Sequence, residues 1–335
     1  MTRWGVVVGL GVAALTVACQ GLDASTLAGT GVKVLGSTAQ ASQRAEQTCG
    51  KLNVDPTVAE EYALGSAMAI EWVKEGGGLM LAARAEGGQG PSVHAGVHTY
   101  VNLVGKNLAA QSKRPTLEWT FGVIDDTKSV NALSAPGGYI FVTRALLAEL
   151  ENEGQLAGTL AHEIAHVVLK HSIQQYNKAK VDLCETAIYS DALVPGSGKL
   201  IAATKGDGTL DLDGDPALLD SAAQKTLGFF SKGNDQKMEF AADEMAVQLM
   251  VSAGYDPEDY RRLLAKTEEV TTVSSRHPKK ADRVKRLVAY LATLKGAKDG
   301  EFSELSLEGL RSPPLEPTFV AAVRGASSGV AKDGK

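Results

Sequence analysis

The sequence predicts a mostly helical α+β fold with one small sheet. Apolar residues recur at helical spacing in most segments between residues 55 and 295. Residues 117–143 differ, because "LEWTFGVI", "SVNALSA" and "YIFVT" are rich in β-branched and aromatic side chains, and a Pro-Gly-Gly turn separates the last two. One short sheet that contains a hairpin, with helices before and after it, is typical of the α+β class.

The composition is that of an ordinary folded protein. Of the 335 residues, 44% are apolar and 22% are charged, which argues against general disorder and against a protein with several membrane spans. A chain of this length can bury one substantial core or two small ones. The formal net charge is -5 and no long basic block occurs, so nucleic acid is not an expected partner. The oligomeric state is left open.

Ordinary start and stop signals bound the expected helices. The first begins near Pro56 with acidic residues early and a lysine late, and a glycine cluster at residues 76–78 ends it. The second stops before Pro115, and Gly254 caps the helix that contains "EFAAD". Residues 182–235 show no clear pattern. In chain order, the expected helices are "TVAEEYALGSAMAIEWVK", "VHTYVNLVGKNLAAQ", "RALLAEL", "GTLAHEIAHVVLKH", "DQKMEFAADEMAVQLMVSA", "PEDYRRLLAKTEEV" and "ADRVKRLVAYLATL".

The first nineteen residues are typical of an export signal. One arginine precedes an apolar run that ends at Ala18, too short to cross a bilayer as a stable helix. The ending "LTVAC" resembles a bacterial lipobox, although Thr16 stands where leucine is commonest. We therefore expect Cys19 to be lipidated, and Gln20 in place of aspartate favours the outer membrane, with the protein facing the periplasm. The alternative is a plain signal peptide cut after Ala18.

The other two cysteines form a possible pair. If Cys19 carries lipid, Cys49 and Cys184 remain in an oxidising compartment, where a disulfide can form. Two free buried thiols are the alternative, because sequence spacing does not measure their separation.

A candidate metal site begins in "GTLAHEIAHVVLKH", residues 158–171. On a helix, His162 and His166 lie about 40° apart on one face, so both imidazoles can reach one ion. A His-Glu-x-x-His pattern alone is a moderate signal, and a solvent-facing polar stripe is the alternative. Catalytic zinc needs three protein ligands and one open position.

A second helix offers the missing ligand. In "EFAAD", Glu239 and Asp243 are four residues apart on one face. Glu239 can be the third ligand, and Asp243 can accept the free ring N–H of a ligating histidine, with His162 the preferred one. An acidic helix surface is the alternative. Of the remaining histidines, we expect a surface or capping role for His171 and a structural or solvated role for His94 and His98.

Four ordered runs resemble one family of zinc metallopeptidases over residues 55–295. The family (metallopeptidase family forty-eight, of the gluzincin type) includes the CAAX prenyl protease, the HtpX membrane protease and their soluble periplasmic and lipoprotein relatives. The resemblance implies a zincin-like domain whose edge strand lies above the metal. The runs are "VNALSAPGGYIFVTRALLAEL", "LAGTLAHEIAHVVLKHS", "MEFAADEMAVQLMVSAGYDP" and "SRHPKKADRVKRL".

The resemblance also implies roles for individual residues. His162, His166 and Glu239 match the zinc ligands, Glu163 the general base and Asp243 the acid behind the ligands. Asn131 matches an edge-strand residue that pairs with substrate backbone. His277 and Arg283 match residues placed near the metal. In some relatives the histidine that corresponds to His277 occupies the open coordination position of the zinc. In this chain Arg276 precedes His277, where threonine is commoner.

These roles predict a zinc endopeptidase with one Zn²⁺ per chain. Glu163 would activate a zinc-bound water, and Arg283 or His277 would help to hold the oxyanion. Recognition of extended backbone by an edge strand suits unfolded or misassembled envelope proteins. The first alternative is a chaperone or assembly factor for outer-membrane proteins with latched or absent proteolysis. A zinc esterase or amidase acting on cell-wall peptides is the second.

The expected organisation has four parts. A signal peptide occupies residues 1–18, and a lipidated N-terminus and tether follow at 19–54. The metallopeptidase domain covers residues 55–295, and a flexible tail covers 296–335.

Overall fold

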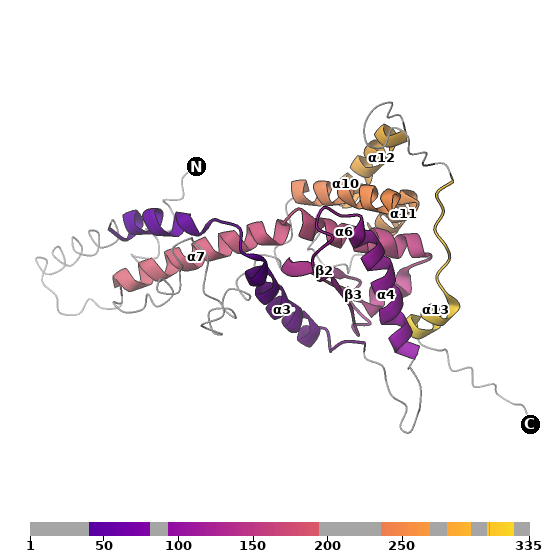
Figure 1. Ribbon diagram of the computed structural model, residues 1–335, viewed down its shortest axis with the longest axis horizontal. Helices are drawn as coiled ribbons and strands as arrows, with labels where there is room; N and C mark the ends of the chain where they lie inside the picture. Colours follow the sequence, from indigo (N-terminus) through magenta and orange to yellow (C-terminus); the bar gives the residue numbers. More distant parts are fainter. Residues whose placement is uncertain are drawn as a thin grey trace, which may run out of the picture. The chain divides into compact units, whose positions relative to one another are not determined.

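The computed structural model confirms a mostly helical α+β fold with a small mixed sheet (Figure 1). It describes residues 40–80, 93–193, 236–268, 280–295, 307 and 309–324. After a helix at residues 40–49, the elements are η1 (Gly50–Leu52), α3 (Val58–Glu75), α4 (Val93–Ala110), β1 (Thr120–Ile124), β2 (Ala132–Ala135), η2 (Pro136–Gly138), β3 (Tyr139–Thr143), α5 (Arg144–Glu149), α6 (Glu153–Val168), α7 (His171–Leu193), α10 (Gln236–Ser252), α11 (Pro257–Glu268), α12 (Lys280–Lys295) and α13 (Pro317–Arg324).

The chain divides into two compact units. The smaller contains the described residues 40–52 and 181–193, and the larger contains the remaining described residues. In the smaller unit, the helix at 40–49 and the second part of α7 share an apolar core. A disulfide joins Cys49 to Cys184 there, with a Cα–Cα distance of 5.6 Å. Residues 40–52 were predicted to belong to a tether. The structure describes a helix in this part of the predicted tether, with a buried face and a disulfide to α7.

The sheet has the strand order β1-β3-β2. β1 and β3 run parallel, while β2 runs antiparallel to β3 and lies at one edge. The predicted hairpin between β2 and β3 turns through η2, where Gly137 and Gly138 have positive φ angles of 78° and 91°. Those angles favour glycine, because a Cβ atom would be strained there.

α6 is the central helix of the larger unit. It packs against α10, α11, α4 and β2, so that it lies between the edge of the sheet and α10 (Figure 1). Asn152 caps its N-terminus by accepting a hydrogen bond from the Gln155 N–H. Nearly all its residues are buried, including the polar ones of the His-Glu-x-x-His motif. A solvent-facing polar stripe is therefore excluded for this helix.

The C-terminal segment contains a helix that the sequence did not predict. Residues 296–335 were expected to form a flexible tail, but α13 packs on α4 and α5. Phe319 is buried against the ring of Tyr100, and the Arg324 side chain donates hydrogen bonds to the carbonyls of Ala148 and Leu150. Within the predicted tail, α13 therefore adds apolar residues to the core of the larger unit. Among the described residues, no helix is both long and apolar enough to span a membrane.

The close packing of α6 on α11 gives a testable prediction. A Cβ atom at Gly158 would lie 2.4 Å from the Cβ of Tyr260, whereas a Cβ at Gly96 on α4 would meet nothing within 4 Å. We expect Gly158→Ala to lower the free energy of unfolding by about 1–3 kcal/mol. Gly96→Ala should raise it by about 0.5–1 kcal/mol, because alanine loses less entropy in a helix. Denaturant unfolding measures both, and equal effects would contradict the close contact.

Candidate active site

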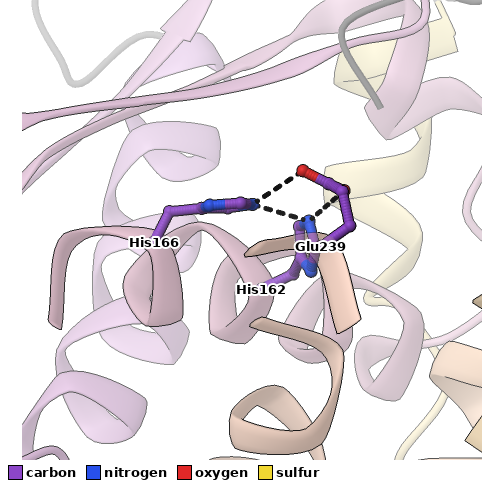
Figure 2. Close-up of side chains that lie close together, drawn as sticks. All are labelled: His162, His166 and Glu239. Atoms are coloured by element: carbon purple, nitrogen blue, oxygen red, sulfur yellow. Dashed lines mark hydrogen bonds and ion pairs between the residues drawn. The ribbon is translucent and has the colours of Figure 1, made fainter. Parts of the chain in front are cut away.

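Three predicted ligands from two helices meet at one point. His162 and His166 project from α6, and Glu239 reaches them from α10 (Figure 2). The two Nε2 atoms are 3.1 Å apart. The Glu239 carboxylate oxygens lie 3.5 Å from Nε2 of His162 and 3.4 Å from Nε2 of His166. All three side chains are buried, and Glu239 is 0% exposed.

These distances fit a metal ion. Ligand atoms at about 2.0–2.1 Å from a tetrahedral zinc lie roughly 3.3–3.4 Å from one another. The two Nε2 atoms are 3.1 Å apart, and their separations from the Glu239 carboxylate, 3.5 Å to Oε2 and 3.4 Å to Oε1, are close to that value. Two imidazoles and a carboxylate are also a ligand set that zinc accepts in catalytic sites. His162, His166 and Glu239 could therefore hold a divalent cation.

The hydrogen bonds of the Nδ1 atoms of His162 and His166 support a metal site. Nδ1 of His162 lies 3.0 Å from Oδ1 of Asp243, and Nδ1 of His166 lies 2.8 Å from Nδ1 of His171. The first bond needs a proton on Nδ1 of His162, and the second can be made with a proton on Nδ1 of His166 and His171 as the acceptor. In these tautomers the Nε2 atom of each ligand histidine has a free lone pair directed at the shared point. A divalent cation would stabilise these two lone pairs and the Glu239 carboxylate, and in its absence a proton on His162 supplies positive charge at the same place.

His171 is the site residue that the sequence assigned wrongly. A surface or capping role was expected because a continuous helix would turn it about 140° from His166. The helix ends first, since Leu169 caps α6 and Lys170 has a φ of 59°. α7 then begins at His171, which is 5% exposed and contacts His166. The left-handed residue, usually a glycine at a helix end, gave no signal here because it is a lysine.

Asp243 belongs to a buried cluster with Arg283 of α12 and Tyr260 of α11. Nε and Nη2 of Arg283 donate to the two Asp243 oxygens over 2.9 and 2.7 Å, and Nη1 lies 3.1 Å from Glu239 Oε2. The Tyr260 hydroxyl donates to Asp243 over 2.7 Å and accepts from Arg283. The guanidinium thus holds Glu239 and Asp243 of α10 in place. Nothing in the sequence singled out Tyr260, since one tyrosine on an amphipathic helix carries no signal.

The surroundings set the charges of this cluster. Burial raises the pKa of Asp243, but the Arg283 guanidinium outweighs burial and holds that pKa well below its ordinary range. Burial and Arg283 lower the pKa of His162, whereas hydrogen bonds to Asp243 and Glu239 raise it to about 9 in the absence of metal. Burial keeps the pKa of His166 below its ordinary value. The acidic groups therefore attract positive charge to the point where the ligands meet.

The remaining predicted residues are placed as follows. Glu163 is 3% exposed on α6, and its Oε2 accepts a hydrogen bond of 2.6 Å from the hydroxyl of Ser134 on β2. Asn131 directly precedes β2, and its carbonyl accepts from the Thr143 N–H of β3. His98 Nε2 lies 2.8 Å from the Met80 carbonyl, as a structural histidine would.

Three predicted positions lie outside the described part of the chain: Cys19, His277 and the side chain of His94.

Comparison with known proteins identifies the family. A model described as peptidase family M48 matches residues 97–291, more than half of the chain. The chain belongs to this peptidase family. The matched range contains the β2–β3 hairpin, α6, α10 and Arg283. The predicted metallopeptidase family and hydrolase class are therefore confirmed.

Two kinds of relatives in this family resemble the chain. It is 28% identical over 179 residues to the beta-barrel assembly-enhancing protease of Yersinia pestis, which covers 53% of this chain and 34% of that protein. The protein of that name from Escherichia coli K12 gives the same values. This chain is also 28% identical over 208 residues to the mitochondrial metalloendopeptidase OMA1 of Schizosaccharomyces pombe. That alignment covers 60% of this chain and 55% of that protein. The chain thus matches less than two thirds of the length of each relative.

The contact between His166 and His171 gives a second prediction. We expect His171→Ala to lower zinc affinity by about ten- to a hundredfold, because His166 loses the partner that orients its ring. Competition with a chelator at fixed pH measures the change. The matched control is His98→Ala, which removes a histidine bonded to the Met80 carbonyl and should leave zinc affinity unchanged. Equal affinities in the two variants would contradict the role of His171.

Proposed function

We propose that the chain is a zinc-dependent endopeptidase acting on unfolded or misassembled envelope proteins. The observation that carries the proposal is the convergence of His162, His166 and Glu239 at 3.1–3.5 Å beside the buried carboxylate of Glu163. That constellation supplies a metal site and a base within one helical turn. Membership of a peptidase family supports peptide bonds as the target.

The proposed ligands are His162, His166 and Glu239, with one Zn²⁺ per chain. A bound zinc ion supplies Lewis acidity, which polarises the scissile carbonyl and makes water more acidic. Asp243 and His171 hold the two imidazoles in the required tautomer, and Arg283 orients Glu239 and Asp243 through an ion pair and hydrogen bonds. The direct help of Arg283 or His277 with the oxyanion stays a prediction.

Glu163 carries the proton transfer in this proposal. It lies beside His162 in the sequence and shares the buried face of α6 that meets β2. Its carboxylate accepts a proton from the water that attacks the peptide carbonyl, and it then donates this proton to the leaving nitrogen. Water and peptide must therefore approach from the side on which β2 runs.

The edge strand suggests the class of substrate. In the part of the chain that the structure describes, β2 pairs with β3 alone, so its other side can accept an extended peptide. Asn131 is proposed to contact that peptide where β2 begins. Only a segment free of its own secondary structure can add to a strand, which favours unfolded or misassembled polypeptides over compact domains. The name of the bacterial relatives supports envelope proteins as the source of such segments.

The proposed location follows from the N-terminal sequence. Lipidation of Cys19 would anchor the chain to the outer membrane, facing the periplasm. The disulfide between Cys49 and Cys184 supports an oxidising compartment of this kind. The alternative function is a chaperone that binds unfolded proteins without cleaving them. The cleavage assays described next distinguish it from the peptidase.

Removing the base tests the mechanism. We expect Glu163→Gln to retain zinc and to lower kcat for peptide cleavage by roughly a hundred- to ten-thousandfold, because glutamine cannot accept the proton. Zinc content and cleavage of casein are measured on the same preparation. Glu71→Gln, on α3 and paired with Lys74, is the control and should cleave like the wild type. A fully active Glu163→Gln variant would remove Glu163 from the mechanism.

Substrate conformation gives a further prediction. The soluble form, without residues 1–19, should cleave casein or a reduced and unfolded protein much faster than the same protein in its folded state, since only extended backbone can pair with β2. Gel analysis over time measures both rates. Preference for the folded form would contradict the edge-strand proposal, and binding of casein without cleavage by the zinc-loaded wild type would favour the chaperone.

A further inference from the structure

Ser134 makes a contact with the base that the proposed mechanism has not used. Its hydroxyl donates to Oε2 of Glu163 over 2.6 Å, and both side chains are buried. A distance of about 2.5–2.7 Å is typical of a hydroxyl that bonds an ionised carboxylate. The bond connects the edge strand β2 to the central helix α6 through two residues that are 29 positions apart in the sequence.

The backbone of Ser134 faces the open side of the same strand. The Thr143 N–H donates to the Asn131 carbonyl, so residues 131 and 143 bond each other across the ladder. In an antiparallel pair, such residues alternate with residues whose backbone groups point away from the partner strand. Counting along the register, Leu133 and Ala135 face β3, whereas Ala132 and Ser134 turn their backbone N–H and C=O toward the edge.

We propose that Ser134 is a positioning residue that fixes the Glu163 carboxylate for proton transfer and ties it to the strand on which substrate lies. The proposal rests on the peptidase function proposed above. Ser134 does not exchange a proton with substrate. It acts by engaging one carboxylate oxygen, which sets the rotation of the carboxylate plane and the position of the other oxygen.

A glutamate benefits from such a contact because its side chain has several rotatable bonds. A catalytic carboxylate displaced by about 1 Å from its reactive position loses much of the rate advantage of a fixed geometry. A serine on β2 can supply this restraint because the side chain projects toward α6 while the backbone faces the edge. A peptide paired with the edge would therefore lie next to the backbone of the residue that holds the base.

The test compares two variants of nearly equal shape. Ser134→Thr keeps the hydroxyl, and Ser134→Val replaces it with a methyl group on the same branched side chain. Both are favourable residues in a strand, so folding should be affected alike. Zinc content, unfolding temperature, kcat and KM for casein-derived peptide are measured for both, for wild type and for Ser66→Ala. In that control, the lost hydroxyl donates to the Ala63 carbonyl within α3, away from the ligands.

We expect Ser134→Val to bind zinc fully and to show a kcat about ten- to a hundredfold below that of Ser134→Thr, with KM changed less than threefold. This range follows from the loss of a hydrogen bond to a charged group. Ser134→Thr should stay within a few fold of wild type, and Ser66→Ala should equal it. Ser134→Ala serves as a second hydroxyl-free variant if Ser134→Val does not fold.

The outcomes separate this inference from the proposed function. Equal kcat values for the threonine and valine variants, with an active wild type, would overturn the role of Ser134 and leave the peptidase intact. A zinc-loaded wild type without cleavage would overturn the proposed function itself. A change in KM alone, or in unfolding temperature alone, would show that the hydroxyl serves binding or folding and would also overturn the inference.

Discussion

The buried Nε2 atoms of His162 and His166 lie 3.1 Å apart, each is 3.4–3.5 Å from a different oxygen of the Glu239 carboxylate, and the packing of the larger unit maintains this convergence. Without a metal ion, hydrogen bonds to Asp243 and Glu239 raise the pKa of His162 to about 9, so a proton at neutral pH supplies the positive charge that these buried carboxylates attract. The arrangement persists because rigid elements hold each side chain. α10 can approach α6 closely because Ala242 and Ala246 are small and fully buried.

The groups behind the ligands come from elements on several sides. α11 and α12 supply Tyr260 and Arg283, which satisfy Asp243 behind His162. The start of α7 supplies His171 behind His166. β2 supplies Ser134 beside Glu163. Because every one of these contacts crosses between elements, the geometry of the site depends on the packing of the whole unit and cannot be formed by α6 alone.

The sequence predicted the parts of the site that depend on local spacing. The four-residue separation of His162 and His166, and of Glu239 and Asp243, fixes each pair on one helix face whatever the tertiary structure. His171 was misassigned because its position depends on where α6 ends, and the left-handed turn at Lys170 carries none of the usual glycine signal. Ser134 and Tyr260 were missed because their partners lie on other elements.

The fold, like the site, was predicted where local spacing determines the structure and missed where distant contacts do. Helices with strong periodicity and clear stop signals were predicted, as was the hairpin with its Pro-Gly-Gly turn. The helix at residues 40–49 was missed because its buried face consists of small residues and one cysteine, whose partner Cys184 is 135 positions away. α13 was missed because its helical pattern is short and the prolines around it resemble a loop. Both segments gain their order from distant contacts, which spacing along the chain does not reveal.

X-ray absorption at the zinc edge of the purified soluble protein tests the central claim most directly. We expect one zinc per chain, bound by nitrogen and oxygen at about 2.0–2.2 Å with the scattering pattern of two imidazoles. Glu239→Ala should lose most of that zinc, because one of the three ligands is gone. Absence of stoichiometric zinc at neutral pH, or a sulfur ligand at about 2.3 Å, would contradict the site.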